Sequence, residues 1–97
     1  MYEIEFTVRA AQDLSWFKKS GQNEILDGIE AQLCYEPTVE TRNRKRLRPG
    51  QAAEWELRVG RFRVFYDVDQ EEFSVSIQAV GLKVGNKVYF QGKEQKQ

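Results

Sequence analysis

The run WELRVGRFRVFYDVD at residues 55–69 limits the possible folds more than any other stretch of the chain. Apolar and polar residues alternate on both sides of Gly60, and a period of two residues is that of a β-strand with one buried face. A glycine between two such strands is typical of a tight hairpin turn. The sequence therefore predicts a hairpin whose second face carries three arginines, Arg58, Arg61 and Arg63.

The rest of the chain predicts two helices and two further strands. Apolar residues recur at helical spacing over 9–20 and again over 23–35, where Pro37 prevents continuation. Strands are expected over 2–8, 53–59, 61–68 and 73–80, with a basic loop over 38–52, and the last strand is expected to bury Phe73, Val75, Ile77 and Ala79.

The element order is thus β-α-α-β-β-β. Two amphipathic helices need an apolar surface, and one face of an antiparallel sheet supplies it. We expect an α+β fold with two N-terminal helices packed on one face of a mainly antiparallel four-stranded sheet. The arginines of the hairpin then lie on the face that the helices leave open.

Length and composition limit the classes of protein further. The 97 residues suit a single domain, 1–97, with a polar tail expected to fray from about residue 91. No apolar run approaches the ~20 residues that span a bilayer, and no secretory signal is recognisable, so we expect no membrane association. A single cysteine, Cys34, agrees with a cytoplasmic location and is expected to be a small buried hydrophobe.

The formal net charge of zero hides a strong asymmetry along the chain. Residues 1–40 hold three basic and eight acidic side chains, a net of −5. Residues 41–63 hold eight basic and two acidic side chains, a net of +6, and residues 64–97 hold four and five, a net of −1. One face of the domain can therefore attract an anion, for which nucleic-acid phosphate is the simplest candidate, although a solvated basic loop remains the alternative.

The residue types exclude several kinds of chemistry. The chain has no histidine, the commonest general base and metal ligand, and one cysteine cannot form a zinc-binding set. We therefore expect no metal and no cofactor. Arginine, lysine and tyrosine remain, and these can stabilise phosphate and move protons without a metal.

With these features the sequence resembles the RelE/ParE superfamily of bacterial toxins from type II toxin–antitoxin pairs. The resemblance covers nearly the whole chain, from the helix pair ending in LCYEP through NRKRLR to the hairpin and VGLKVGNKVY. It implies a RelE-like fold, an antitoxin partner and, in the RelE branch, metal-independent cleavage of messenger RNA at the ribosome. In that reaction the ribose 2′-hydroxyl attacks the adjacent phosphate and leaves a 2′,3′-cyclic phosphate.

The resemblance also implies roles for individual residues. Arg63 matches the arginine that binds the scissile phosphate, Lys83 stands where a second arginine is frequent, and Tyr89 matches the C-terminal tyrosine that stacks on or orients a base. The basic residues that would contact RNA are Arg42, Arg44, Lys45, Arg46, Arg58 and Arg61.

Two positions depart from the RelE pattern. Glu54 and Glu56 stand where that branch has lysines, so either is a candidate base or a repulsive substitution beside phosphate. Three functions stay open: a ribosome-dependent mRNA endonuclease, a ParE-like inhibitor of DNA gyrase, and a degenerate toxin that only binds its antitoxin. The basic residues favour the first, and the two glutamates favour the others.

Overall fold

The computed structural model describes residues 1–94 and confirms the α+β class. Its elements are β1 (Glu3–Phe6), α1 (Val8–Trp16), α2 (Lys19–Leu33), β2 (Arg44–Arg46), β3 (Trp55–Val59), β4 (Phe62–Asp69), β5 (Ser74–Val84), β6 (Lys87–Phe90) and β7 (Lys93–Glu94). No helix in this part of the chain is both long and apolar enough to cross a membrane.

Within residues 1–94 the sheet has seven strands, more than the four expected. The order β2-β3-β4-β5-β6-β7 is antiparallel throughout, and β1 pairs with β5 in parallel. Strand β2 forms within the segment predicted to be a loop, because its three residues pair with β3. Strand β7 forms within the tail expected to fray, of which residues 95–97 lie outside the described part.

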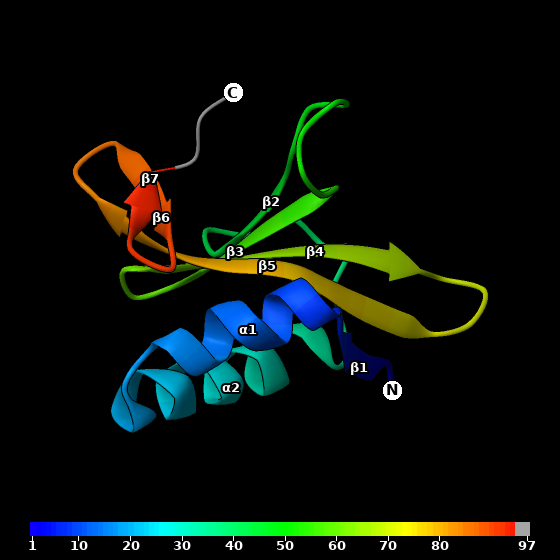
Figure 1. The fold of residues 1–97 in the computed structure, drawn as a ribbon. Helices are drawn as coiled ribbons and strands as arrows, with labels where there is room; N and C mark the ends of the chain where they lie inside the picture. Colours follow the sequence, from blue (N-terminus) through cyan, green and yellow to red (C-terminus); the bar gives the residue numbers. More distant parts are fainter. Residues whose placement is uncertain (95–97) are drawn as a thin grey trace.

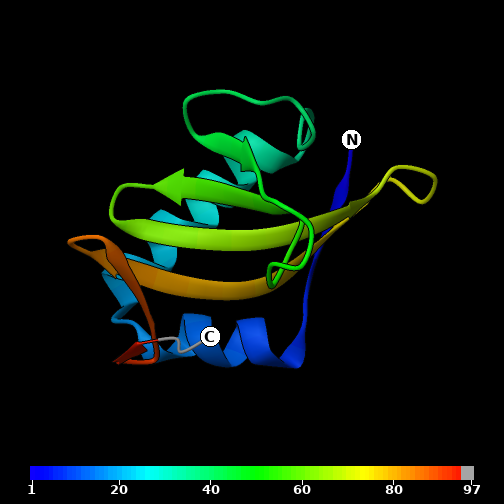
Figure 2. The same ribbon diagram turned by 90° about the horizontal axis from the view of Figure 1, so that it is seen from above.

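Both helices cover the same face of the sheet, as predicted (Figures 1 and 2). The side chain of Thr7 starts α1 by accepting a hydrogen bond from the Ala10 amide at 3.0 Å. Each helix begins and ends earlier than the apolar spacing suggested, and Cys34 is buried at the end of α2. The buried core between helices and sheet consists of Ala10, Ile25, Ile29, Leu33, Trp55, Leu57, Val64, Tyr66, Val75, Ile77 and Val80.

The central hairpin forms as the sequence predicted. Strands β3 and β4 pair from Trp55 opposite Tyr66 to Val59 opposite Phe62. The turn needs a left-handed residue, and Gly60 supplies it with φ of +57°. Because the core residues alternate with Glu56, Arg58 and Arg63, these polar side chains lie on the face away from the helices, which we call the open face.

A register shift in β5 changes which residues face the helices. Tyr66 lies opposite Ile77 while Phe65 lies opposite Ala79, so Gln78 is an extra residue between them. Beyond it, Val80 joins the core and Ala79 is buried on the open face, which corrects the prediction for Ala79. The prediction for Phe73 was also wrong, because it has φ of +52° in the turn before β5 and is exposed.

Candidate functional site

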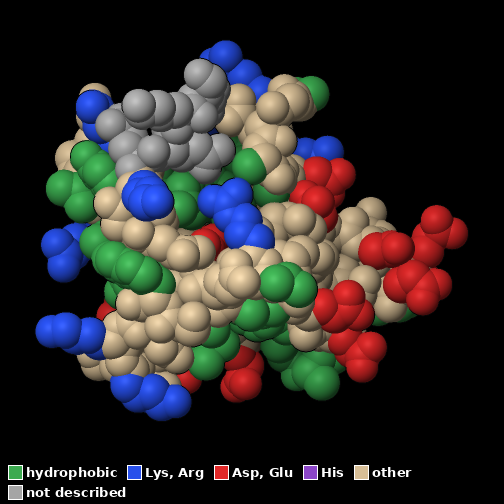
Figure 3. All heavy atoms as spheres, viewed as in Figure 1, with side chains coloured by type: hydrophobic (Ala, Val, Ile, Leu, Met, Phe, Trp, Pro, Cys, Tyr) green, Lys and Arg blue, Asp and Glu red, His purple; other side chains and the backbone are tan. Residues whose placement is uncertain are grey.

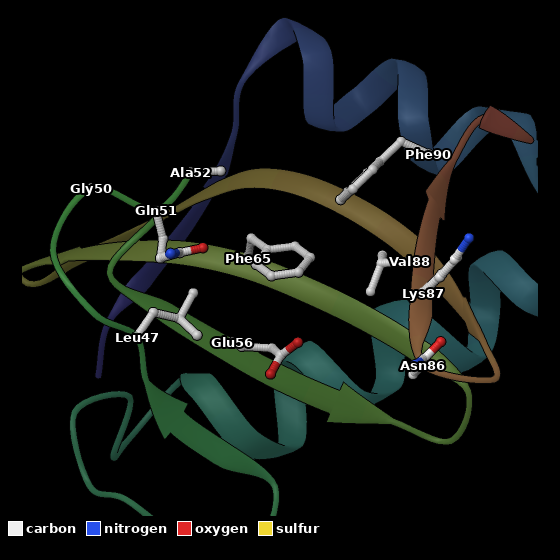
Figure 4. Close-up of a pocket in the computed structure, with 10 residues that line it drawn as sticks. All are labelled: Leu47, Gly50, Gln51, Ala52, Glu56, Phe65, Asn86, Lys87, Val88 and Phe90. Atoms are coloured by element: carbon white, nitrogen blue, oxygen red, sulfur yellow. The ribbon is translucent and has the colours of Figure 1, made fainter. Parts of the chain in front are cut away.

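A hollow of about 660 Å³ lies over the open face of the sheet (Figure 4). One wall is the segment after β2, residues 47–52, and the other is β6 with the turn before it. Its lining consists of Leu47, Gly50, Gln51, Ala52, Glu56, Phe65, Asn86, Lys87, Val88 and Phe90.

The floor of the hollow joins an aromatic surface to a carboxylate. Phe65 and Glu56 are directly opposite each other on β4 and β3, and both are half-buried. The Phe65 and Phe90 ring centroids are 5.7 Å apart. Strand β6 can lie this close because Gly81 has no side chain: a Cβ there would be 2.7 Å from Val88 Cγ1.

Two arginines lie directly opposite each other beside this floor. Arg58 on β3 pairs in register with Arg63 on β4, two positions along the ladder from Glu56 and Phe65. Arg58 is exposed, whereas Arg63 is only 8% exposed. Arg63 Nη1 donates to the carbonyl oxygens of Gly60 at 2.9 Å and Phe62 at 2.8 Å. The hairpin turn therefore holds the Arg63 guanidinium in a fixed orientation.

The surroundings of Arg63 disfavour its charge. Burial lowers the pKa of Arg63, Glu56 opposes this by raising it, and Arg58 lowers it further. The residue stays protonated at neutral pH, since an arginine pKa begins so high. Arg63 makes no ion pair and uses only Nη1 in hydrogen bonds to residues 1–94, so Nε and Nη2 are available to an anion.

Two other residues predicted to be catalytic, Lys83 and Tyr89, lie on different sides of the sheet. Lys83 alternates with Leu82 on β5 and lies half-buried near the turn, where its amide donates to the Arg61 carbonyl at 2.8 Å. Arg61 itself is an exposed turn residue. Tyr89 pairs with Leu82 and alternates with Val88 and Phe90, so it does not line the hollow. Its role in base stacking stays a prediction.

Arg44, predicted to contact RNA, is buried within the fold. It is 6% exposed, and its Nε donates to the Val39 carbonyl at 2.8 Å. Its Nη1 donates to the Gln32 carbonyl at 2.7 Å and to Gln32 Oε1 at 3.0 Å. Because α2 ends at Leu33, this guanidinium caps the C-terminal turn of the helix, where a cation is favoured. These bonds, rather than a substrate, occupy Arg44.

The remaining basic residues of the segment predicted to contact RNA do not share one face of the sheet. Arg42 and Lys45 are exposed, and Lys45 lies opposite Glu56 on the open face. Arg46 lies opposite Trp55, with its guanidinium carbon 5.5 Å from the Trp55 ring centroid, so it belongs to the helix side of the sheet. Among the described residues, none of these basic side chains lines the hollow, although Lys45 lies on the same face of the sheet.

The two glutamates that depart from the family pattern are separated. The Glu56 side chain extends into the hollow (Figure 4). Glu54 precedes β3 and is exposed; its Oε1 accepts from the Val68 amide at 3.5 Å, and it lines a second hollow together with Asp67. Of the two, the structure associates only Glu56 with the arginine pair.

The sequence did not predict the hydrogen bonds and ion pair that hold β6 and the turn after it against α1. The buried Asp13 accepts from Gln91 Nε2 at 2.7 Å and from the Val80 amide at 3.0 Å, and it forms an ion pair with Arg9 at 3.4 Å. The Arg9 guanidinium carbon also lies 4.8 Å from the Phe90 ring centroid. The spacing of Arg9 and Asp13, four residues apart on a helix, was the only available signal.

Charge is distributed along the long axis of the sheet. Acidic side chains gather on the right of Figure 3, over the end of the β4–β5 hairpin, while lysines and arginines lie mainly to the left and above. Among residues 1–94, no group of three or more acidic or cysteine side chains is suited to hold a metal ion. The arginine pair beside the hollow suits an anion, and the rings of Phe65 and Phe90 suit an aromatic group.

Comparison with solved structures identifies the fold. A chain of the toxin–antitoxin complex RelBE2 from Mycobacterium tuberculosis is 28% identical, over 84% of this chain and 98% of that one, with a TM-score of 0.74. The isolated E. coli RelE toxin is 21% identical, over 88% and 87%, with a TM-score of 0.68. A chain of the RelE–RelB complex from Pyrococcus horikoshii is 20% identical, over 81% and 91%, with a TM-score of 0.65. No family model and no curated protein matches the sequence.

The fold and these similarities together define the class. The chain has the fold of RelE-like toxins and is similar in sequence to the RelBE2 chain, which agrees with the resemblance that the sequence predicted.

Proposed function

We propose that this chain is the toxin of a type II toxin–antitoxin pair and cleaves messenger RNA on the ribosome without a metal. The observation that carries the proposal is the pair Arg58 and Arg63, directly opposite each other on the open face. Like charges in this position destabilise a sheet. A bound phosphate removes that cost, because both guanidinium groups can donate to its oxygens.

The chemistry follows from how Arg63 is held. Transfer of the phosphate to the ribose 2′-oxygen passes through a phosphorane with developing negative charge, which fixed donors stabilise best. Two hydrogen bonds to the hairpin turn orient the Arg63 guanidinium before substrate arrives. Lys83, half-buried on the same side of β5, supplies a second positive charge for the leaving 5′-oxygen.

The partner of the proposed toxin is an antitoxin, by analogy with the complexes RelBE2 and RelE–RelB. A negatively charged segment that folds on binding suits the basic open face and blocks the same arginines. We propose that the toxin acts in the cytoplasm, where translating ribosomes supply its substrate.

The decisive experiment incubates the purified chain with ribosomes carrying a defined messenger RNA and maps the ends produced. We expect cleavage that leaves a 2′,3′-cyclic phosphate and falls by roughly 10²–10³ in Arg63→Ala, the usual cost of losing one preorganised donor. Arg58→Ala should also weaken cleavage. Lys19→Ala, an exposed charge on α2, removes the same charge on the covered side and is the control.

Two outcomes would replace this proposal. Intact transcripts together with trapped gyrase–DNA cleavage complexes would establish inhibition of DNA gyrase instead. Intact transcripts and normal gyrase activity, with tight binding to an antitoxin, would establish a degenerate toxin. The Arg63→Ala result counts only if circular dichroism and the melting temperature show that the variant is folded.

A further inference from the structure

Among residues 1–94, the hollow on the open face is lined by one carboxylate, that of Glu56. Glu56 is half-buried, and its carboxylate extends into the hollow from β3 (Figure 4). It makes no hydrogen bond or ion pair with the described residues 1–94. Lys45 lies opposite Glu56 and favours its charge, but the carboxylate oxygens accept no hydrogen bond from residues 1–94, so a bound ligand can supply the donors.

The floor of the hollow beside this carboxylate suits a flat aromatic ligand. Phe65 lies directly opposite Glu56 in the sheet, and Phe90 contacts Phe65 from β6. The two ring centroids are 5.7 Å apart, too close for a third ring to enter between them, so a ligand stacks on the pair from the hollow. Single-stranded RNA bases are commonly held by stacking of this kind and by hydrogen bonds to their Watson–Crick edge.

The arginine pair lies at the right distance for the phosphate of the same nucleotide. Arg58 follows Glu56 by two residues on β3, and Arg63 precedes Phe65 by two on β4. Two residues along a strand span about 7 Å. A base over Phe65 therefore leaves its phosphate within reach of Arg58 and Arg63.

We propose that this hollow binds a guanine base of the RNA, with Glu56 as the residue that selects it. Guanine is the one common base whose Watson–Crick edge presents two adjacent donors, N1–H and the N2 amino group, and a carboxylate accepts both. Adenine and cytosine place a ring-nitrogen acceptor beside their amino group, which the carboxylate repels. Asn86 projects into the same hollow (Figure 4) and offers an amide donor to guanine O6.

The inference rests on the proposed function, since it names which base of the RNA occupies the site. It is tested without ribosomes, by titrating the isotope-labelled chain with each of the four ribonucleoside 5′-monophosphates. The readout is the NMR shift of the amides of Phe65, Asn86 and Val88. We expect GMP to bind about tenfold or more tightly than AMP, CMP or UMP, the discrimination expected of one bidentate pair.

Three variants make the result specific. Glu56→Gln replaces one acceptor by a donor, so the preference for GMP should disappear while the fold, judged by the NMR spectrum, is kept. Phe65→Leu should weaken all four nucleotides and leave their order unchanged. Glu72→Gln makes the same change of charge at the tip of the β4–β5 hairpin and should bind as the unmodified chain does.

The outcomes separate this inference from the proposed function. Equal affinity for the four nucleotides, no binding of any of them, or an unchanged preference in Glu56→Gln would each overturn the guanine site. Loss of cleavage at every sequence in Glu56→Gln, with its preference for GMP intact, would identify a catalytic base instead. A chain that prefers GMP but cuts no RNA would contradict the proposed function alone.

Discussion

Replacing Arg44 by alanine should destabilise the whole domain. Arg44 lies in the basic segment that the sequence assigned to RNA binding, yet the structure buries it between β2 and the end of α2. Its guanidinium donates to the carbonyls of Val39 and Gln32 and to Gln32 Oε1. The substitution removes all three hydrogen bonds and leaves the two carbonyls without that donor.

The size of the effect follows from these contacts. A hydrogen bond to a charged group contributes about 1.5–3 kcal/mol, but the three bonds share one side chain and water enters part of the vacated space. We therefore expect a loss of about 2–4 kcal/mol in the free energy of unfolding. Each 1 kcal/mol lowers the melting temperature of a domain of this size by about 4–8 °C, so the shift should be roughly 8–32 °C.

Urea denaturation followed by tryptophan fluorescence measures this loss, because Trp55 is buried in the core and becomes exposed on unfolding. Arg42→Ala is the matched control, since Arg42 is exposed two residues earlier and should change stability by less than about 0.5 kcal/mol. Equal stabilities of the two variants would refute the structural role of Arg44.

Three further substitutions test other parts of the fold. Asp13→Asn keeps one acceptor for two donors, so unfolding should become easier by about 1–3 kcal/mol and the Val80 amide should exchange faster with deuterium. Burial raises the pKa of Tyr66, whose hydroxyl donates to the Pro37 carbonyl at 2.7 Å. The folded state therefore holds its proton more tightly, so stability should fall as pH rises above about 10, and Tyr66→Phe should flatten that decline in pH-dependent urea titrations. Arg58→Gln should raise stability by about 0.2–1 kcal/mol and weaken RNA binding, measured by denaturation and by filter binding.

The central elements were predictable because their signals are local. Alternation around Gly60 is enough to define the β3–β4 hairpin, its register and two of the three arginines predicted for its open face, Arg58 and Arg63, whereas Arg61 lies in the turn. The apolar spacing likewise defined both helices, although not where they end. Strand β2 has no such signal, because its three residues are all basic and become a strand only by pairing with β3.

The parts of the site that were not predictable depend on contacts between distant residues. The extra residue Gln78 changes which residues of β5 face the helices. The alternating sequence before Gln78 gives no signal of this change. Phe90 reaches Phe65 only because β6 lies close over Gly81. Arg44 and Lys45 are adjacent basic residues that lie on opposite faces of β2. The pairing of Arg44 with Leu57 determines which face each one occupies.

On the open face, one cross-strand pair of charged residues stabilises the sheet and a neighbouring pair destabilises it. Lys45 lies opposite Glu56, an arrangement of opposite charges that favours a sheet. Two positions along β3 from Glu56, Arg58 lies opposite Arg63, and neither arginine makes an ion pair with the described residues. The same sheet pairs unlike charges elsewhere. The chance occurrence of two arginines at these positions is therefore a poor explanation for a pair that repel each other. It also does not explain why the hairpin turn holds one of them in place. Residues that cost stability and are nevertheless rigidly oriented are expected where a ligand compensates for their charge, and this expectation supports the proposal that Arg58 and Arg63 bind a phosphate.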